Sequence, residues 1–296
     1  MKYLQSLSKF VFRAGTRVLL PALFFFACKK PSSENGTGKS MQQVYEIDYA
    51  YGNHPDEKMD IFIPAGDRDT MALMVLVHGG SWVGGDKSDL QDWFNYERTH
   101  KNLAVININY RLDNYYTCPL PMQTDDIDMA IEKLREDFSF PAERIALLGG
   151  SAGGHLVSYY AYTYDNARYV KAVANFVGPV DFTDPVYHTD DHFKWIFSGI
   201  EYIFNLEYEG NEQQYAGWSP YTHASPQSPP TILLYGEQDT LVPYTNGLRM
   251  HQRLDSLGVE NAFHLYPGSG HLFNDADMLD ASIKAEEFMY RHLFQH

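Results

Sequence analysis

The sequence predicts one α/β domain, built on a mostly parallel sheet of eight strands that is flanked by helices, with an insertion after the sixth strand. From Val44 onward, short runs rich in β-branched and aromatic residues alternate with amphipathic stretches. This alternation is typical of strand–helix units around a parallel sheet. The chain has 296 residues, of which 44% are hydrophobic and 15% aromatic, so it is large enough to bury a substantial core.

The predicted elements follow the chain in order. The strands are Val44–Tyr51, Lys58–Ile63, Met71–Val77, Leu103–Asn109, Arg144–Leu148, Val170–Val177, Thr231–Tyr235 and Ala262–Tyr266. The turn-prone "GNHPDE" between the first two indicates an antiparallel opening, and helical stretches separate the later strands. The clearest helix is Gln123–Phe138, in which Ile127, Ala130, Ile131 and Leu134 have helical spacing.

Residues 182–228 interrupt this alternation with an aromatic and acidic segment. The segment is too long for an ordinary connection. It could lie over the mouth of the sheet and shape substrate access, or it could be a helical excursion packed on the flank. Its Tyr and Trp side chains could stack on an acyl or sugar group, or they could pack into a core.

The N-terminus predicts export. Residues 1–27 contain four basic residues, no acidic residue and the apolar run "VLLPALFFFA", as in a secretory signal peptide. This run is about half the ~20 residues that a membrane-spanning helix needs. Cys28 follows, and "FFAC" resembles the lipobox of bacterial lipoproteins, which implies cleavage before Cys28 and a lipid anchor on an exported protein. An ordinary signal peptide with an incidental cysteine is the alternative.

The composition restricts the partners and the covalent links. Residues 28–43 are polar and rich in Pro, Gly and Ser, as expected of a flexible tether, which leaves 44–296 as the folded domain. The net charge of −15 argues against binding nucleic acid or anionic lipid headgroups, so a lipid anchor would be the only membrane link. Besides Cys28 only Cys118 is present, so a lipidated Cys28 leaves no disulfide within the domain.

The residues 149–153, "GGSAG", fit the pattern G-x-S-x-G. A predicted strand precedes them and a predicted helix, Ala152–Tyr162, follows, which is the context that this pattern requires. Glycines on both sides of a serine suit a strained strand-to-helix turn that is closely packed. A flexible turn is the alternative, but the context favours Ser151 as a nucleophile.

A serine nucleophile needs a base to take its proton and an acid to orient that base. His271 in "YPGSGHLF" follows the last predicted strand, and Asp239 in "LLYGEQDTLVP" follows the strand before it. The order Ser, Asp, His at strand C-terminal ends fits a catalytic triad. Asp239 could instead cap a helix, and Asp181 is the alternative acid. His264 lies inside a predicted strand and is expected to be structural.

The segment "VLVHGGSWVGGDK" follows a buried strand. Its "HGG" resembles the loop of esterases whose backbone amides bind an oxyanion. The expected donors are Gly79, Gly80 and Ala152. Ser81 stands where the fuller motif has a third glycine, which leaves open which pair of amides acts. Ser81 and Trp82 are candidates for substrate contacts.

Two other chemistries are weighed against this one. The "GGDKS" stretch is similar to a phosphate-binding loop, but Asp86 breaks the required Gly-Lys-Ser spacing. His188 and His192 lie four residues apart and could share a helix face, but Thr189 stands where a metalloprotease has glutamate. We therefore expect no metal and no cofactor.

The chain from Val44 to His296 resembles the α/β-hydrolase superfamily. Within it, the chain is similar to the esterase branch that includes feruloyl and acetyl xylan esterase-like proteins, with hormone-sensitive-lipase-like and kynurenine-formamidase-like relatives. The motifs that carry this resemblance are "HGGSWVGGDK", "NYRL", "GGSAGGHL", "ASPQSPPTILLYGEQDTLVP" and "GSGHLF". Gly150 departs from it, because those branches often have Asp or His there.

The resemblance implies acyl transfer to water in two steps. Ser151 would attack an ester carbonyl, His271 would take its proton, and Asp239 would hold the imidazole. The expected substrates are small acyl esters, including those linked to carbohydrates. A serine peptidase or amidase of the same superfamily and a catalytically silent, glycan-binding lipoprotein are the alternatives.

Overall fold

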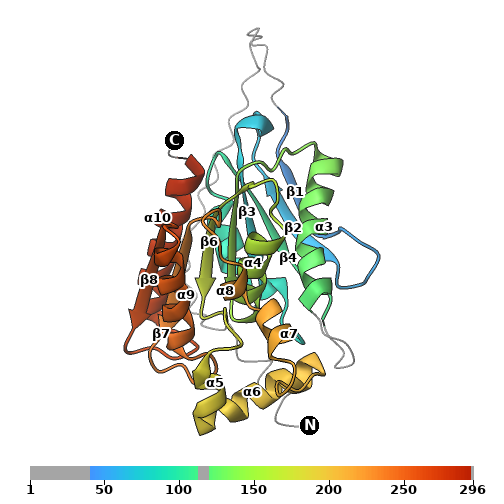
Figure 1. Cartoon of the computed structure of the whole chain (residues 1–296). Coiled ribbons are helices and arrows are strands. Elements are labelled where there is room, and N and C mark those ends of the chain that lie inside the picture. The colour runs from blue at the N-terminus through green and yellow to red at the C-terminus, as the bar shows by residue number, and fades with distance from the viewer. Residues whose placement is uncertain (1–40, 113–119, 295–296) are drawn as a thin grey trace, which may run out of the picture.

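The computed structural model describes residues 41–112 and 120–294, and it shows an eight-stranded sheet covered by helices (Figure 1). The strands are β1 (Val44–Ala50), β2 (Lys58–Ile63), β3 (Ala72–Val77), β4 (Leu103–Ile108), β5 (Ile145–Gly150), β6 (Val170–Phe176), β7 (Thr231–Gly236) and β8 (Asn261–Tyr266). Their order is β1-β2-β4-β3-β5-β6-β7-β8. β1 and β2, and β2 and β4, pair antiparallel, and the other pairs are parallel. The predicted fold class, all eight strands and the antiparallel opening are confirmed.

The helices follow the predicted alternation. They are α2 (Gln91–Glu97), α3 (Leu120–Phe138), α4 (Ala152–Thr163), α5 (Pro185–Thr189), α6 (Asp191–Phe204), α7 (Glu212–Gly217), α8 (Pro220–His223), α9 (Tyr244–Ser256) and α10 (Asp275–Phe294), with short 3₁₀ turns η1 (Arg68–Thr70) and η2 (Lys87–Leu90). The predicted helix at 123–138 is α3, which begins three residues earlier.

The core lies on both faces of the sheet because side chains alternate along each strand. In β3, Leu73, Val75 and Val77 pack on the face that α3 and α4 cover, whereas Met74 and Leu76 pack on the face that α2 and α10 cover. α9 covers the end of the sheet formed by β7 and β8, on the side of Leu233 and Tyr235. Parallel strands buried on both faces read as continuous apolar runs, which is why their positions could be found in the sequence.

The long segment after β6 forms the four helices α5 to α8. Figure 1 shows α5 and α6 at the end of the sheet toward which the arrows of β6, β7 and β8 point. His192 on α6 lies 2.8 Å from the carbonyl oxygen of Thr240, in the loop after β7. The segment therefore contacts the loops at the C-terminal edge of the parallel strands.

The predicted signal peptide, Cys28 and most of the predicted tether lie outside the described residues, as does Cys118. Within the part of the chain that the structure describes, no helix has the length and apolar character that crossing a membrane requires.

A buried ion pair ties the antiparallel strands to the loop after β3. The Lys87 ammonium lies 2.6 Å from an oxygen of Asp60 and 2.9 Å from one of Asp48. The Asp60 side chain is only 2% exposed. Removing one partner of a buried pair leaves an uncompensated charge, which costs about 3–5 kcal/mol.

We therefore predict that Lys87→Met lowers the free energy of unfolding by about 3 kcal/mol, measured by urea denaturation. Lys133→Met is the matched control, because Lys133 pairs with Asp137 on the surface of α3 and such pairs contribute less than about 1 kcal/mol. Equal losses in the two variants would contradict the prediction.

A second buried charge lies between α2 and α10. Glu97 is fully buried and accepts a hydrogen bond of 2.8 Å from the Tyr290 hydroxyl. Burial raises the pKa of Glu97 to about 7. The His100 imidazole lies 3.6 Å from Glu97 through Nδ1 and 3.5 Å from Glu286 through Nε2, so it lies between the two carboxyls.

Because its pKa is raised on folding, Glu97 adds stability that is present below its unfolded pKa and is lost as the pH rises through about 7. We predict that the free energy of unfolding contains a decline of about 3 kcal/mol between pH 4.5 and 7.5 that Glu97→Gln removes. Denaturation at several pH values measures it. Glu286→Gln, at a partly exposed position, should retain the decline; an unchanged slope in Glu97→Gln would refute the assignment.

Candidate active site

Ser151 occupies a strained turn between β5 and α4. Its φ of 54° and ψ of −124° are sparsely populated for a residue with a side chain. Its amide donates a 2.8 Å hydrogen bond to the Phe176 carbonyl. A Cβ at Gly153 would lie 2.2 Å from the Val77 carbonyl oxygen, so only glycine allows α4 to begin this close to the end of β3. The turn therefore fixes Ser151 at the C-terminal edge of the sheet.

The structure brings the three predicted triad residues together. His271 Nε2 lies 2.9 Å from Ser151 Oγ, and His271 Nδ1 lies 2.8 Å from an oxygen of Asp239. The Asp239 side chain is fully buried and that of His271 is 9% exposed. The three residues come from the loops after β5, β7 and β8, so the parallel topology gathers them at one edge.

The loops that carry Asp239 and His271 are bonded to each other. The Gln238 amide donates to the Ser269 carbonyl at 3.0 Å, and the Gln238 side chain donates to the Pro267 carbonyl at 2.9 Å. The second Asp239 oxygen accepts hydrogen bonds from the amides of residues 241 and 242, at 2.7 and 2.9 Å. One oxygen of Asp239 thus holds its own loop, while the other holds the imidazole.

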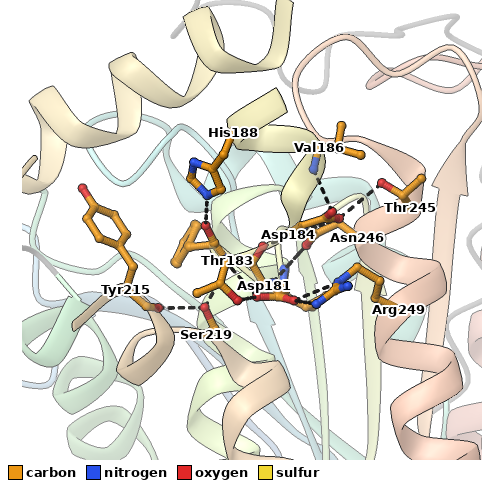
Figure 2. A network of polar contacts seen from close by, with 12 residues as sticks. Asp181, Thr183, Asp184, Val186, His188, Tyr215, Ser219, Thr245, Asn246 and Arg249 are labelled. Carbon is orange, nitrogen blue, oxygen red and sulfur yellow. Dashed lines mark hydrogen bonds and ion pairs between the residues drawn. The ribbon is translucent and has the colours of Figure 1, made fainter. Parts of the chain in front are cut away.

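Asp181, the alternative acid, is engaged elsewhere. It is fully buried, and one of its oxygens accepts from Arg249 Nε and Nη2 at 2.9 and 2.8 Å. Its other oxygen accepts from the amide and hydroxyl of Thr183. Figure 2 shows this network, in which Asn246 on α9 also donates to the Asp181 carbonyl oxygen. With both carboxylate oxygens occupied, Asp181 does not serve as the partner of His271.

The loop after β3 has three successive residues with positive φ. They are Gly80 at 120°, Ser81 at 53° and Trp82 at 62°. A Cβ on Gly80 would lie 2.1 Å from the Gly84 carbonyl oxygen. Gln123, at the start of α3, donates a 2.7 Å hydrogen bond to the Trp82 carbonyl. This long-range bond stabilises a backbone that would otherwise be strained, and sequence analysis did not identify Gln123 because nothing local signals its contact.

Two buried histidines support the same loop. His78 Nδ1 lies 2.7 Å from the Gly79 carbonyl oxygen, and the Tyr110 hydroxyl donates to the His78 carbonyl at 3.0 Å. His155 on α4 lies 2.9 Å from the Trp218 carbonyl oxygen through Nε2. Burial lowers the pKa of both imidazoles to about 4. Both are therefore neutral at pH 7 and act as fixed hydrogen-bonding and packing groups.

The expected substrate contact by Trp82 is wrong in this structure. Its ring is only 4% exposed and packs edge-on against His155, Phe182 and Phe204. The indole NH approaches His155 Nδ1 at 3.4 Å. Trp82 belongs to the core cluster on the face of the sheet that α3 and α4 cover. Ser81 is exposed and remains a candidate.

The metal alternative finds no support in the side chains. His188 lies 2.9 Å from the Phe182 carbonyl oxygen and stacks on Tyr208, while His192 contacts the loop after β7. Within residues 41–112 and 120–294, no three His, Cys, Asp or Glu side chains are placed to hold a metal ion. The two histidines thus bond to separate carbonyls.

Comparisons with known proteins agree with this fold. The chain is 24% identical over 247 residues to the acylamino-acid-releasing enzyme of Rattus norvegicus, covering 77% of this chain and 32% of that protein. It is 25% identical over 262 residues to a probable carboxylic ester hydrolase, LipM, of Mycobacterium tuberculosis, covering 82% and 59%. The chain thus spans about a third of the length of the acylamino-acid-releasing enzymes that it matches.

A solved structure and a family model give the fold and the family of the chain. A truncated carbohydrate esterase from gut microbiota has a TM-score of 0.66 to this chain at 19% identity, covering 86% of this chain and 98% of that one. At this identity the likeness establishes the fold, which is that of the α/β hydrolases. The BD-FAE family model matches residues 59–254. Since this match spans more than half of the sequence, the chain belongs to the BD-FAE family.

Proposed function

We propose that the protein is a carboxylic ester hydrolase that works through an acyl-enzyme on Ser151. The observation that carries this proposal is the pair of hydrogen bonds, 2.9 and 2.8 Å long, that links Ser151 to His271 and His271 to Asp239. Membership of the BD-FAE family and the similarity to a probable carboxylic ester hydrolase of M. tuberculosis support it.

The proposed reaction begins with attack on the ester carbonyl. His271 Nε2 accepts the proton of Ser151 Oγ as the new C–O bond forms, because a neutral hydroxyl is a poor nucleophile. Asp239 accepts a hydrogen bond from Nδ1–H of the imidazole, which keeps its own proton; this bond fixes the tautomer and stabilises the imidazolium. His271 then gives the proton to the leaving alcohol. A water molecule, activated by the same imidazole, releases the acid and restores Ser151.

The negative oxygen of the tetrahedral intermediate needs preorganised donors. The amide of Ala152 lies at the N-terminus of α4, where the first amides have no partner within the helix. The Gly153 contact with the Val77 carbonyl brings this terminus against the loop that carries Gly79 and Gly80. We assign the oxyanion to these amides, each of which typically contributes about 3 kcal/mol to transition-state stabilisation.

The proposed substrates are carbohydrate-linked or other small acyl esters. The family match and the structural likeness to a carbohydrate esterase support this class. We also propose, from the sequence of residues 1–28, that the chain is exported and attached to a bacterial membrane through Cys28. Its domain at 44–296 would then act on substrates outside the cytoplasm.

A serine peptidase or amidase is the second candidate function. The similarity to acylamino-acid-releasing enzymes favours it, and the same triad cleaves amides in proteases of unrelated folds. The third candidate is a glycan-binding protein, in which Ser151, His271 and Asp239 would be in place but no substrate would be turned over. Acid release from acetylated xylan and methyl ferulate, compared with amine release from an aminoacyl anilide, separates the three.

We predict that the purified protein hydrolyses at least one of these esters, that a fluorophosphonate labels Ser151, and that Ser151→Ala lowers kcat by about 10⁴-fold or more. Removing the hydroxyl eliminates the attacking atom but leaves the fold intact, which circular dichroism checks. Anilide cleavage alone would favour the peptidase, and unlabelled, inactive protein would favour the binding protein.

A second prediction distinguishes the two aspartates. Asp239→Asn should lower kcat by about 10⁴-fold, because an amide holds the imidazole in the wrong tautomer. Asp181→Asn is the matched control: it should lower the free energy of unfolding through the loss of the Arg249 pair while kcat stays within threefold. A larger loss of kcat in Asp181→Asn than in Asp239→Asn would reverse the assignment.

A further inference from the structure

A groove of about 700 Å³ opens beside Ser151 and His271. Its walls come from the first part of α10, from α2 with the turn before it, from the end of β6 with the next residue, and from the residues after His271. Pockets of about 300–1,000 Å³ are the usual size for small-molecule sites. The groove is therefore large enough for much more than an acetyl group.

The walls of this groove are mainly apolar. The apolar lining residues are Trp93, Phe176, Val177, Leu272, Phe273, Met278, Leu279 and Ile283. Leu279 is 64% exposed, while Leu272 and Ile283 are each 46% exposed. Leu279 and Ile283 are one helical turn apart on α10, and Ala281 and Ala285 of the same helix are buried against the sheet. Exposed apolar surface that is continuous with a nucleophile marks a ligand-binding surface.

The charges around the groove have one sign. Asp89, Asp92, Asp275 and Glu286 line it, and none of the described residues that line it is a lysine or an arginine. Carboxylates within a screening length of about 8 Å repel an anionic ligand. The net charge of the whole chain, −15, adds to this field. The acidic lining therefore disfavours binding of a ligand that carries a carboxylate, but it does not disfavour a neutral or cationic ligand.

We propose that this groove holds an apolar, uncharged portion of the ester substrate, so that the preferred substrates are neutral esters with an alkyl or aromatic group longer than acetyl or methyl, and anionic esters are selected against. The inference rests on the proposed ester hydrolysis and adds its substrate class. The group could belong to the acid or to the alcohol of the ester, since both leave the same carbonyl carbon.

The test measures kcat/KM of the full chain on two series that share methyl acetate. One series lengthens the acid, up to methyl hexanoate, and the other lengthens the alcohol, up to hexyl acetate. Burying one methylene typically raises kcat/KM about fourfold, so we expect a rise of at least tenfold in one series. The series that rises identifies the side of the ester that the groove holds. No rise in either series would overturn the proposal.

Variants test whether the groove causes the dependence of kcat/KM on ester length. Leu279→Asp should lower the ratio of kcat/KM for the longer ester to kcat/KM for methyl acetate by at least tenfold, because Leu279 lines the groove that would hold the longer group. Ile47→Asp is the matched control, at a 50% exposed position on β1 that does not line the groove. Ile283→Asp is a second groove variant, in case Leu279→Asp folds poorly. Groove variants that behave like Ile47→Asp would overturn the proposal.

The charge is tested with a matched pair of esters. The longer ester of the responsive series is compared with its counterpart that carries a terminal carboxylate. We expect at least a tenfold preference for the neutral ester, which Asp92→Asn combined with Glu286→Gln should reduce at least threefold. Equal rates for the pair would contradict the selection against anions.

Different results would contradict the groove proposal and the ester hydrolase proposal. If methyl acetate is turned over in a Ser151-dependent way without any dependence on length or charge, the ester hydrolase stands and the groove proposal is wrong. If no ester is turned over and fluorophosphonate does not label Ser151, both are wrong.

Discussion

The close approach of α4 to the end of β3 is the constraint on which the rest of the site depends. A Cβ at Gly153 would come within 2.2 Å of the Val77 carbonyl oxygen, so any other residue would force the helix away from the strand. This approach places Ser151 above the sheet and brings the first amides of α4 against the loop that follows β3. The proposed nucleophile and the proposed oxyanion donors thus have a common structural cause.

This arrangement is costly locally, and contacts from distant elements hold it in place. Non-glycine residues with φ > 0, such as Ser81, Trp82 and Ser151, each cost of order 1–3 kcal/mol where the backbone is strained. The Trp82 carbonyl accepts from Gln123 on α3, and the Trp82 ring packs against His155 on α4. Two neighbouring helices thus stabilise a loop that its own sequence would not specify. A neutral His155 suits this role because it carries no charge that would need a buried counterion.

The sequence allowed the strands and the candidate triad to be predicted, because both follow from local patterns. Buried parallel strands are continuous apolar runs, and residues after such strands must meet at one edge. Position in the sequence favoured Asp239 over Asp181 as the acid, but the pairing of Asp181 with Arg249, which lies 68 residues away, has no local signal in the sequence. The buried position of Trp82 and the Gln123 contact were missed for the same reason, since both depend on packing between elements that are distant in sequence.

The composition of the long segment after β6 leaves two roles open for its aromatic residues, which are stacking on a substrate and packing into the core. Phe204 stacks on Tyr215, and Trp218 packs edge-on against both rings. All three are buried in the core cluster, so they fix the segment to the sheet and are not available to a substrate. The apolar surface beside Ser151 comes instead from the end of β6, from the residues after His271, and from α2 and α10, two helices that the sequence places almost 200 residues apart. Each of these helices buries one side against the sheet, and only the fold shows that their remaining apolar side chains meet. In the function that we propose, specificity therefore depends on helices that flank the sheet, whereas reactivity depends on the loops at its edge.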